Sequence, residues 1–306
     1  MSENKQLFII GSGRSGTTLV QRLFNTFPNV LVWGEHAGFL KEISDAYFNL
    51  TQNPSMFEYS YSQAAPEGTE DSMGFYKRPE RWQAWNNWFH PDDVKQLFRD
   101  YIESFFNPKK IGESEIWGFK EIRYGKNDRV LEFIKELYPE AQFIFITRNG
   151  LNTLESQLTT FHQGESKFLM IKRILQLPTA IKIAYEWAIQ NRYLMHLSKQ
   201  DNSSFHLFQF ETLVKNINVL DPILNNLGLE LGEQQLKVMK MKEGRGSGLE
   251  QTSVDQRWKR LGFIPANIAE LLLGTTNKQL GYQAPKRLLV SSFLGKIADK
   301  LLFKKL

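Results

Sequence analysis

A glycine-rich loop between a strand and a helix constrains this chain more than any other feature of its sequence. The apolar run 7–10 leads directly into the segment Gly11-Ser12-Gly13-Arg14-Ser15-Gly16-Thr17-Thr18. Apolar residues then recur at helical spacing up to residue 27. Glycines let the backbone wrap closely around a ligand, and the N–H groups of such a loop converge on an anion at the positive end of the next helix. The sequence therefore predicts an anion-binding loop; the alternative is a turn that holds no ligand.

The loop departs in two ways from the pattern of nucleoside triphosphatases. Thr17 stands where the pattern GxxxxGK[ST] has the lysine that reaches the β- and γ-phosphates. Arg14 supplies a cation three residues earlier, suited to bidentate binding of an oxyanion. The strand expected at 141–147 ends in Arg148-Asn149, where triphosphatases carry an aspartate for Mg²⁺. Both departures favour two anionic groups, with no triphosphate and no metal.

Strand patterns that alternate with helical patterns predict the fold class. Strand-like runs occupy residues 7–10, 30–33, 116–120, 141–147 and 205–210. Helical patterns cover residues 17–27, 128–138 and 179–198. Such alternation forms βαβ units, so we expect an α/β fold with a central parallel sheet of about five strands flanked by helices. Without repeats or linkers, we expect a single domain over 1–306, with an aromatic insertion at about 51–91 and a basic amphipathic tail at about 286–306.

Composition excludes several classes of protein. Hydrophobic residues make up 42% of the chain and charged residues 23%, so disordered, collagen-like and coiled-coil chains are ruled out. The absence of cysteine rules out disulfides, cysteine-zinc sites and thiol nucleophiles. The net charge of +5 weakly favours an anionic ligand. No apolar run approaches the ~18 residues of a membrane span, and the N-terminus is polar, so we expect a cytoplasmic protein without a signal peptide.

The loop and a second motif resemble those of a known family. Arg-Ser-Gly-Thr-Thr after a strand resembles the 5′-phosphosulfate loop of sulfotransferases that use 3′-phosphoadenosine 5′-phosphosulfate (PAPS). Arginine at position 14 is similar to the bacterial-type and protein-tyrosine branches. Arg148, with Ser156 eight residues later, resembles the family's 3′-phosphate pair. The resemblance implies a P-loop-like fold, PAPS as cofactor and PAP as its product.

Two further segments resemble the nucleotide site of the same family. Phe210 opens a motif similar to the one that lies beside the adenine, with phenylalanine in place of tyrosine. The segment 246–259 resembles the C-terminal nucleotide-binding loop, and its candidate cofactor residues are Ser253, Arg257 and Lys259. The matches run in order from residue 7 to about 260.

The candidate catalytic residues lie at the ends of three predicted strands, at the edge where parallel sheets bind ligands. Lys120 ends its strand there, and the resemblance also implies a functional lysine; a surface lysine is the alternative. Resemblance to the tyrosine-sulfating branch places the acid/base on Glu35, which would need dry surroundings to raise its proton affinity. His36, which titrates near neutrality, is the rival base. Arg14 is the cation expected to stabilise the oxygen left on the nucleotide.

Other patterns have two interpretations each. Trp82, Trp85 and Trp88 either pack a lid helix or form a stacking platform for sugars. The apolar spacing of the C-terminal tail predicts either a helix packed on its own domain or contact with a membrane surface. The lysines and arginines of 237–260 lack the aromatic pattern of a nucleic-acid module, and the remaining histidines lack metal-ligand spacing.

These observations predict a sulfotransferase that moves a sulfuryl group from PAPS to a hydroxyl or amine without a metal. The alternatives are a P-loop nucleotide or small-molecule kinase and a non-catalytic module that binds nucleotides or glycans. A small-molecule or carbohydrate acceptor is favoured over a lipid or a peptide tyrosine.

Overall fold

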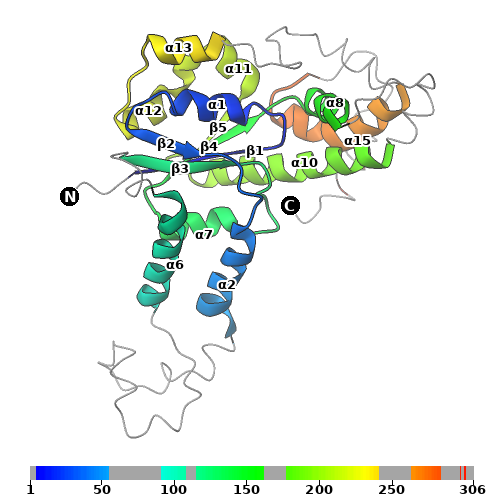
Figure 1. Ribbon diagram of the computed structural model, residues 1–306. Helices are drawn as coiled ribbons and strands as arrows, with labels where there is room; N and C mark the ends of the chain where they lie inside the picture. The colour runs from blue at the N-terminus through cyan, green and yellow to red at the C-terminus, as the bar shows by residue number, and fades with distance from the viewer. Residues whose placement is uncertain are drawn as a thin grey trace, which may run out of the picture.

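A five-stranded parallel sheet forms the centre of the computed structural model (Figure 1). The structure describes residues 5–54, 91–107, 115–161, 177–240 and 263–283, together with Ile297 and Lys300. In that part the strand order is β2-β3-β1-β4-β5, and every pair is parallel. The strands are β1 (Lys5–Gly11), β2 (Val30–Trp33), β3 (Ile116–Glu121), β4 (Gln142–Thr147) and β5 (Phe205–Gln209). The predicted fold class is confirmed.

Strand β1 lies at the middle of the sheet because its side chains are apolar on both faces. Residues 7–10 are fully buried, as expected for a parallel strand covered by helices on each side. The register sets Ile10 opposite Glu121 and Gly11 opposite Ile146. The carboxyl ends of β1, β3 and β4 therefore meet at one edge of the sheet, and the chain leaves β1 there through the glycine-rich loop.

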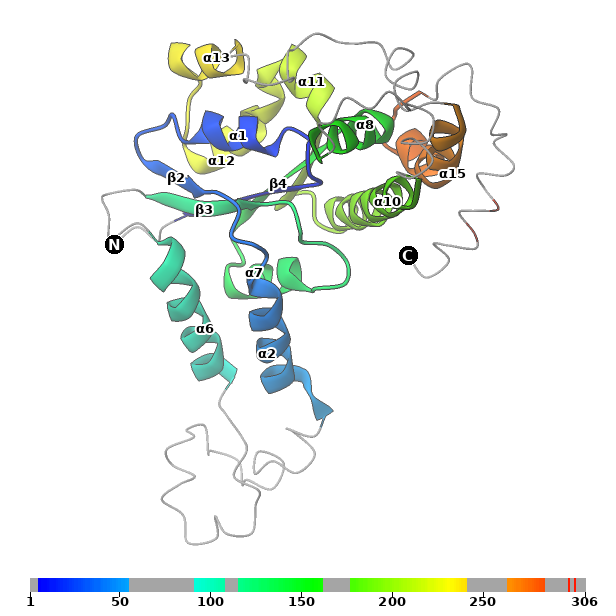
Figure 2. The same ribbon diagram turned by 45° about the vertical axis from the view of Figure 1, so that its right-hand side comes forward.

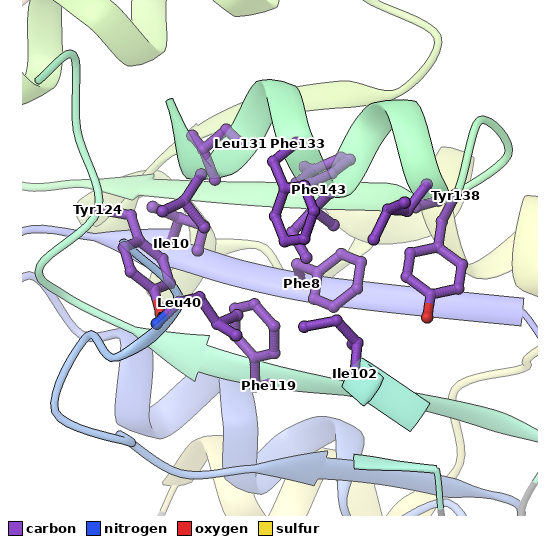
Figure 3. Packing of buried hydrophobic residues seen from close by; sticks show 14 of the residues in the cluster. Phe8, Ile10, Leu40, Ile102, Phe119, Tyr124, Leu131, Phe133, Tyr138 and Phe143 are labelled. Carbon is purple, nitrogen blue, oxygen red and sulfur yellow. The ribbon is translucent and has the colours of Figure 1, made fainter. Parts of the chain in front are cut away.

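The aromatic face of the sheet carries the larger part of the core (Figure 3). The Phe8 ring lies 4.6 Å from the Phe119 ring and 5.3 Å from the Phe143 ring, measured between centroids. Aromatic pairs at these separations add to the stabilisation that their buried area gives. This face is covered by α2 (Leu40–Gln52), α6 (Pro91–Phe106), α7 (Val130–Leu137) and part of α10 (Leu177–Gln200).

The opposite face is aliphatic, and a separate set of helices covers it. Leu7, Ile9, Ile144 and Ile146 point to this side, since they alternate along their strands with the aromatic residues. The covering elements are α1 (Thr17–Phe24), α11 (Phe210–Lys215), η3 (Ile217–Leu220), α12 (Asp221–Leu227) and α13 (Glu233–Lys240). A third cluster joins α10 to α8 (Gly150–Phe161) and α15 (Phe263–Gln279) beside the sheet (Figure 2).

The predicted helices are present, but their bounds differ for local reasons. The helix predicted at 17–27 ends at Phe24, because the Asn25 side chain bonds both the N–H and the C=O of Val32. The helix predicted at 128–138 covers Val130–Leu137. Asp128 lies before the helix, and its carboxylate accepts the N–H of Val130, the first helical residue. The third predicted helix is longer, Leu177–Gln200.

Several helices were not predicted. Two predicted segments lie largely outside the described residues. The first group comprises α2, α6, α8, α11, α12, α13 and α15, with the short helix η3. Of the predicted insertion, residues 51–54 are described and 55–90 are not, and Trp82, Trp85 and Trp88 fall among the latter. Of the tail, only Ile297 and Lys300 are described. Within the described chain, no helix combines the length and apolarity that a membrane span requires.

Glu270 on α15 makes stability depend on pH. Its side chain is 6% exposed, and burial raises its pKa to about 7. The folded state then binds a proton more tightly than the unfolded chain, so stability is lost as pH rises from about 4.5 to 7. We expect Glu270→Gln to match the native protein near pH 4 and to exceed it by roughly 1–3 kcal/mol at pH 8. Urea unfolding at both pH values measures this; the same difference at both would contradict it. Glu132→Gln, at an exposed position, is the control.

Candidate functional site

The candidate site lies at the carboxyl edge of the sheet, where parallel sheets bind ligands. The glycine-rich loop follows β1 there, Lys120 and Glu121 end β3, Arg148 follows β4, and Glu35 comes two residues after β2. Four segments far apart in the sequence thus contribute to one edge.

Glycines give the loop its shape. Gly16 has φ +101° and begins helix α1 in a left-handed conformation, which favours glycine. A Cβ on Gly16 would also overlap the Phe210 ring, and a Cβ on Gly11 would overlap the carbonyl oxygen of Ile146. The loop closes on itself through the Ser15 N–H, which donates to the Ser12 carbonyl oxygen at 3.1 Å. Both glycines are therefore required for this path of the backbone.

The loop presents polar groups that fit an anion. The side chains of Ser12 and Ser15 are buried, and neither hydroxyl has a hydrogen-bond partner among the residues that the structure describes. Thr17 is also buried, at the start of α1, and Thr18 is half-buried beside it. Buried hydroxyls without partners are costly unless a ligand or water satisfies them. The loop therefore fits a phosphate or sulfate group at the positive end of α1.

The structure brings the second pair of predicted residues to the loop. Arg148 donates from Nη1 to the carbonyl oxygen of Arg14 at 3.2 Å, and the Arg14 Nε donates to the Ser156 Oγ at 3.1 Å. The Arg148 guanidinium carbon lies 5.1 Å from the centroid of the Phe210 ring. Gln157 closes the other side by donating to the Gly13 carbonyl oxygen at 3.0 Å. Three predicted residues, Arg148, Ser156 and Phe210, thus lie around the loop that carries the fourth, Arg14.

The turn after β4 is held in place from outside the sheet. The Asn149 side chain accepts the N–H groups of Leu151 and Asn152 and so caps helix α8. Glu211 accepts the Asn149 N–H at 3.4 Å and the Tyr282 hydroxyl at 2.9 Å. These contacts fix the backbone next to Arg148 and therefore the origin of its side chain.

Glu35 lies between two cations. Lys120 Nζ is 2.5 Å from Glu35 Oε1, and Arg123 Nη1 is 3.3 Å from Glu35 Oε2. Lys120 is 4% exposed, whereas 35% of the Glu35 side chain is exposed among the described residues. The dry surroundings expected for a glutamate base are therefore not found here. The contact between Glu35 and Lys120 brings two of the four predicted catalytic residues together.

Glu121 is buried completely and accepts four hydrogen bonds. Its Oε2 accepts the N–H groups of His36 at 3.1 Å and Gly38 at 3.0 Å. Its Oε1 accepts the Ile122 N–H and Arg123 Nη1, both at 2.7 Å. Burial by itself raises the pKa of Glu121, but these hydrogen bonds outweigh it and hold the pKa below the ordinary value. The carboxylate is thus charged and joins β3 to the loop after β2.

His36 faces the aromatic core. Its Nε2 lies 2.5 Å from the hydroxyl of Tyr124, and rings of Phe39, Phe106 and Phe119 lie within 5.2 Å of its own, between centroids. Burial lowers the pKa of His36, although Glu121 opposes this effect. The effect of burial is the larger of the two, so the pKa of His36 lies below its ordinary value.

The remaining predicted residues are not placed, and four contacting residues were not predicted. Ser253, Arg257 and Lys259 lie outside the described residues. Sequence reasoning missed Glu121, Arg123, Tyr124 and Gln157. The signal for the first two was available, since charged residues that directly follow a buried strand lie at the ligand-binding edge. In the described ranges, no three His, Asp or Glu side chains group closely enough to hold a metal ion.

Comparison with known proteins identifies the family. The model of the sulfotransferase family matches residues 6–233, so this chain belongs to that family. A comparison with curated protein sequences gave no match. A sulfotransferase domain of the Synechococcus PCC 7002 olefin synthase is 18% identical, with a TM-score of 0.50, and the alignment covers 92% of this chain and 96% of that one.

Two other solved structures are similar over comparable lengths. A sulfotransferase domain from the curacin biosynthetic pathway is 17% identical, with a TM-score of 0.48, over 92% of this chain and 99% of that one. A sulfotransferase of Mycobacterium avium is 11% identical, with a TM-score of 0.49, over 94% of this chain and 79% of that one. At these identities a likeness shows the fold alone, and it is the olefin synthase domain that shows it.

Acid should weaken the contribution of Glu121 to the stability of the folded protein. Because its pKa is lowered in the folded state, its charge stabilises the protein above the unfolded value of about 4.5, and this contribution is lost as pH falls through the folded value. We expect Glu121→Gln to be less stable than the native protein by about 2 kcal/mol at pH 7, with the deficit shrinking below pH 4. Chemical unfolding across this range measures the deficit. A deficit that stays constant from pH 7 to pH 3 would contradict the assignment.

Proposed function

We propose that this chain transfers a sulfuryl group from PAPS to a hydroxyl or amine acceptor, without a metal. The observation that carries the proposal is the glycine-rich loop with its own Arg14 and, around it, Arg148, Ser156 and Phe210. Membership of the sulfotransferase family supports the reaction class. The kinase alternative lacks support, because the family match agrees with the loss of the P-loop lysine at Thr17.

The glycine-rich loop would hold the 5′ end of the nucleotide, and Arg148 with Ser156 would hold the 3′-phosphate. The hydroxyls of Ser12 and Ser15 and the N–H groups at the start of α1 suit the 5′-phosphosulfate. Arg148 and Ser156 suit the 3′-phosphate, and Phe210 offers a ring face for the adenine. Ser253, Arg257 and Lys259 remain proposed cofactor residues by resemblance.

PAPS supplies an activated sulfuryl group: the acceptor oxygen or nitrogen forms a bond to sulfur as the bond to the 5′-phosphate oxygen breaks. Glu35 is proposed as the base that takes the acceptor proton, since each of its oxygens keeps a lone pair beyond the contacts to Lys120 and Arg123. Lys120 and Arg14 are proposed to stabilise charge on the departing oxygen. The aromatic packing of His36 favours Glu35 over His36 for this role.

The acceptor is proposed to be a small molecule or carbohydrate, and a non-catalytic binding module is the second candidate function. That second candidate would keep the loop and its arginines. A binding module accounts directly for the exposure of Glu35, because a residue that acts as a base in a closed site is expected to be shielded from water. Turnover separates the two candidates.

Binding of 3′,5′-adenosine bisphosphate (PAP) tests the cofactor site. We expect PAP to bind in the presence of EDTA, and Arg148→Ala to weaken it about 100-fold, because the variant loses a charge-assisted contact to the 3′-phosphate. Isothermal titration calorimetry measures both, with ATP and magnesium as the competing ligand. Lys135→Ala, in the ion pair with Asp201, is a control that should leave PAP affinity unchanged.

If ATP bound only with magnesium and PAP gave no signal, the kinase reading would replace this proposal. Equal PAP affinity in Arg148→Ala would exclude Arg148 from the site.

Loss of the base should abolish turnover and leave binding intact. We expect Glu35→Gln to reduce turnover at least 100-fold with unchanged PAP affinity, because the amide cannot take a proton. Release of PAP from PAPS, measured with phenols, sugars, amines and water as acceptors, provides the rate. His36→Gln is the companion variant and is expected to keep most of the activity. Full activity in Glu35→Gln would transfer the role to another residue, and no activity in the native protein would favour the binding module.

A further inference from the structure

Glu121 makes contacts that end on the residue proposed as the base, and these contacts point to a role beyond packing. Its side chain is fully buried at the end of β3, one residue after Lys120. All its bonds reach either the loop after β2 or the turn after β3. A buried carboxylate is costly unless donors surround it, and here four donors do.

The first set of contacts fixes the backbone that carries Glu35. Glu121 Oε2 accepts the N–H of His36, the residue after Glu35, and the N–H of Gly38. In the stretch from His36 to Gly38, whose N–H groups are these donors, Ala37 and Gly38 have φ values of +60° and +74°. A turn with a left-handed residue at Ala37 lets the N–H groups on either side of it, those of His36 and Gly38, converge on one anion. The Glu121 carboxylate is that anion and thereby holds a strained loop in place.

The second set of contacts fixes the Glu35 side chain. Arg123 Nη1 lies 2.7 Å from Glu121 Oε1 and 3.3 Å from Glu35 Oε2. A guanidinium that is bound to a buried carboxylate loses most of its freedom, so it meets Glu35 from a fixed direction. Lys120 contacts the other Glu35 oxygen. The two oxygens are therefore oriented by two cations, of which one is held by Glu121.

We infer that Glu121 is a positioning residue for sulfuryl transfer: it holds the loop after β2 and the Arg123 side chain so that Glu35 faces the acceptor beside Lys120. This inference rests on the proposed function of Glu35. It assigns Glu121 no contact with the cofactor or the acceptor.

A mutant cycle tests the linkage without any acceptor. The unfolding equilibrium is measured for the native protein, Glu35→Gln, Glu121→Gln and the double variant. We expect the effect of Glu35→Gln on the unfolding constant to be about three- to tenfold smaller in the Glu121→Gln background, because Arg123 is then no longer held against Glu35. In an Arg123→Gln background this coupling should vanish. Additive effects of the two substitutions would overturn the inference, since a purely structural Glu121 would act independently of Glu35.

The matched control pairs Glu121→Gln with Glu132→Gln, whose partner is Arg129. These two glutamates share no partner that the structure gives, so their effects should add. Coupling of the same size in this control would also overturn the inference.

Kinetics distinguish positioning from structural support. With the acceptor that gives turnover in the PAPS assay, we expect Glu121→Gln to lower kcat about 10- to 100-fold while KM for the acceptor and PAP affinity stay unchanged. Glu121→Asp, which keeps the charge, should recover part of the rate. In the Glu35→Gln background, Glu121→Gln should cause no further loss. Full kcat in Glu121→Gln, or an equal further loss in that background, would overturn the inference.

If Glu121→Gln folds poorly, Arg123→Gln tests the inference instead. This variant loses the Arg123 contacts but keeps the three hydrogen bonds that Glu121 accepts from backbone N–H groups. It should reproduce the fall in kcat, and a native kcat would count against the inference. The proposed function fails on a different result: full activity in Glu35→Gln removes the base, while the unfolding cycle still reports whether Glu121 and Glu35 are linked.

Discussion

The parallel pairing of β1 with β3 on one side and β4 on the other is the constraint on which the rest of this structure depends. It sets Ile10 opposite Glu121 and Gly11 opposite Ile146. Because parallel strands end at the same edge, the pairing places the loop after β1, the Lys120 side chain and the turn that carries Arg148 together at that edge. The aromatic and aliphatic clusters on the two faces hold this register, since a shift by one residue would turn each strand's side chains to the wrong face.

The edge divides into two chemically different halves. On one side of the loop, Arg14 and Arg148 contribute positive charge and buried hydroxyls offer hydrogen bonds, as an anionic nucleotide requires. On the other side, carboxylates and cations alternate, from Glu121 through Arg123 to Glu35 and then Lys120. Alternation keeps each charge compensated within a few ångströms, so that a charged carboxylate persists at full burial.

Local patterns in the sequence predicted much of the sheet and several of the residues that the structure brings together at the glycine-rich loop. The strands were identified because buried parallel strands are continuous apolar runs, and Arg14, Arg148, Ser156 and Phe210 because each belongs to a short motif. Element bounds were less accurate, since the Asn25 side chain bonds to Val32 of β2 and the Asp128 side chain to the N–H of Val130 at the start of α7. Helix α6 escaped prediction even though Pro91 and two aspartates mark its first turn.

By itself the sequence determined the α/β class, the glycine-rich loop between β1 and α1 and the family resemblance, because these follow from hydrophobic periodicity and from motifs a few residues long. Only the tertiary structure decided which charges meet. Glu35 and Lys120 are 85 positions apart in the chain, and the link from Glu121 to the loop after β2 spans a similar separation. Such pairings depend on strand order and register, which bring distant segments to the same edge of the sheet, and no local pattern of residues encodes them.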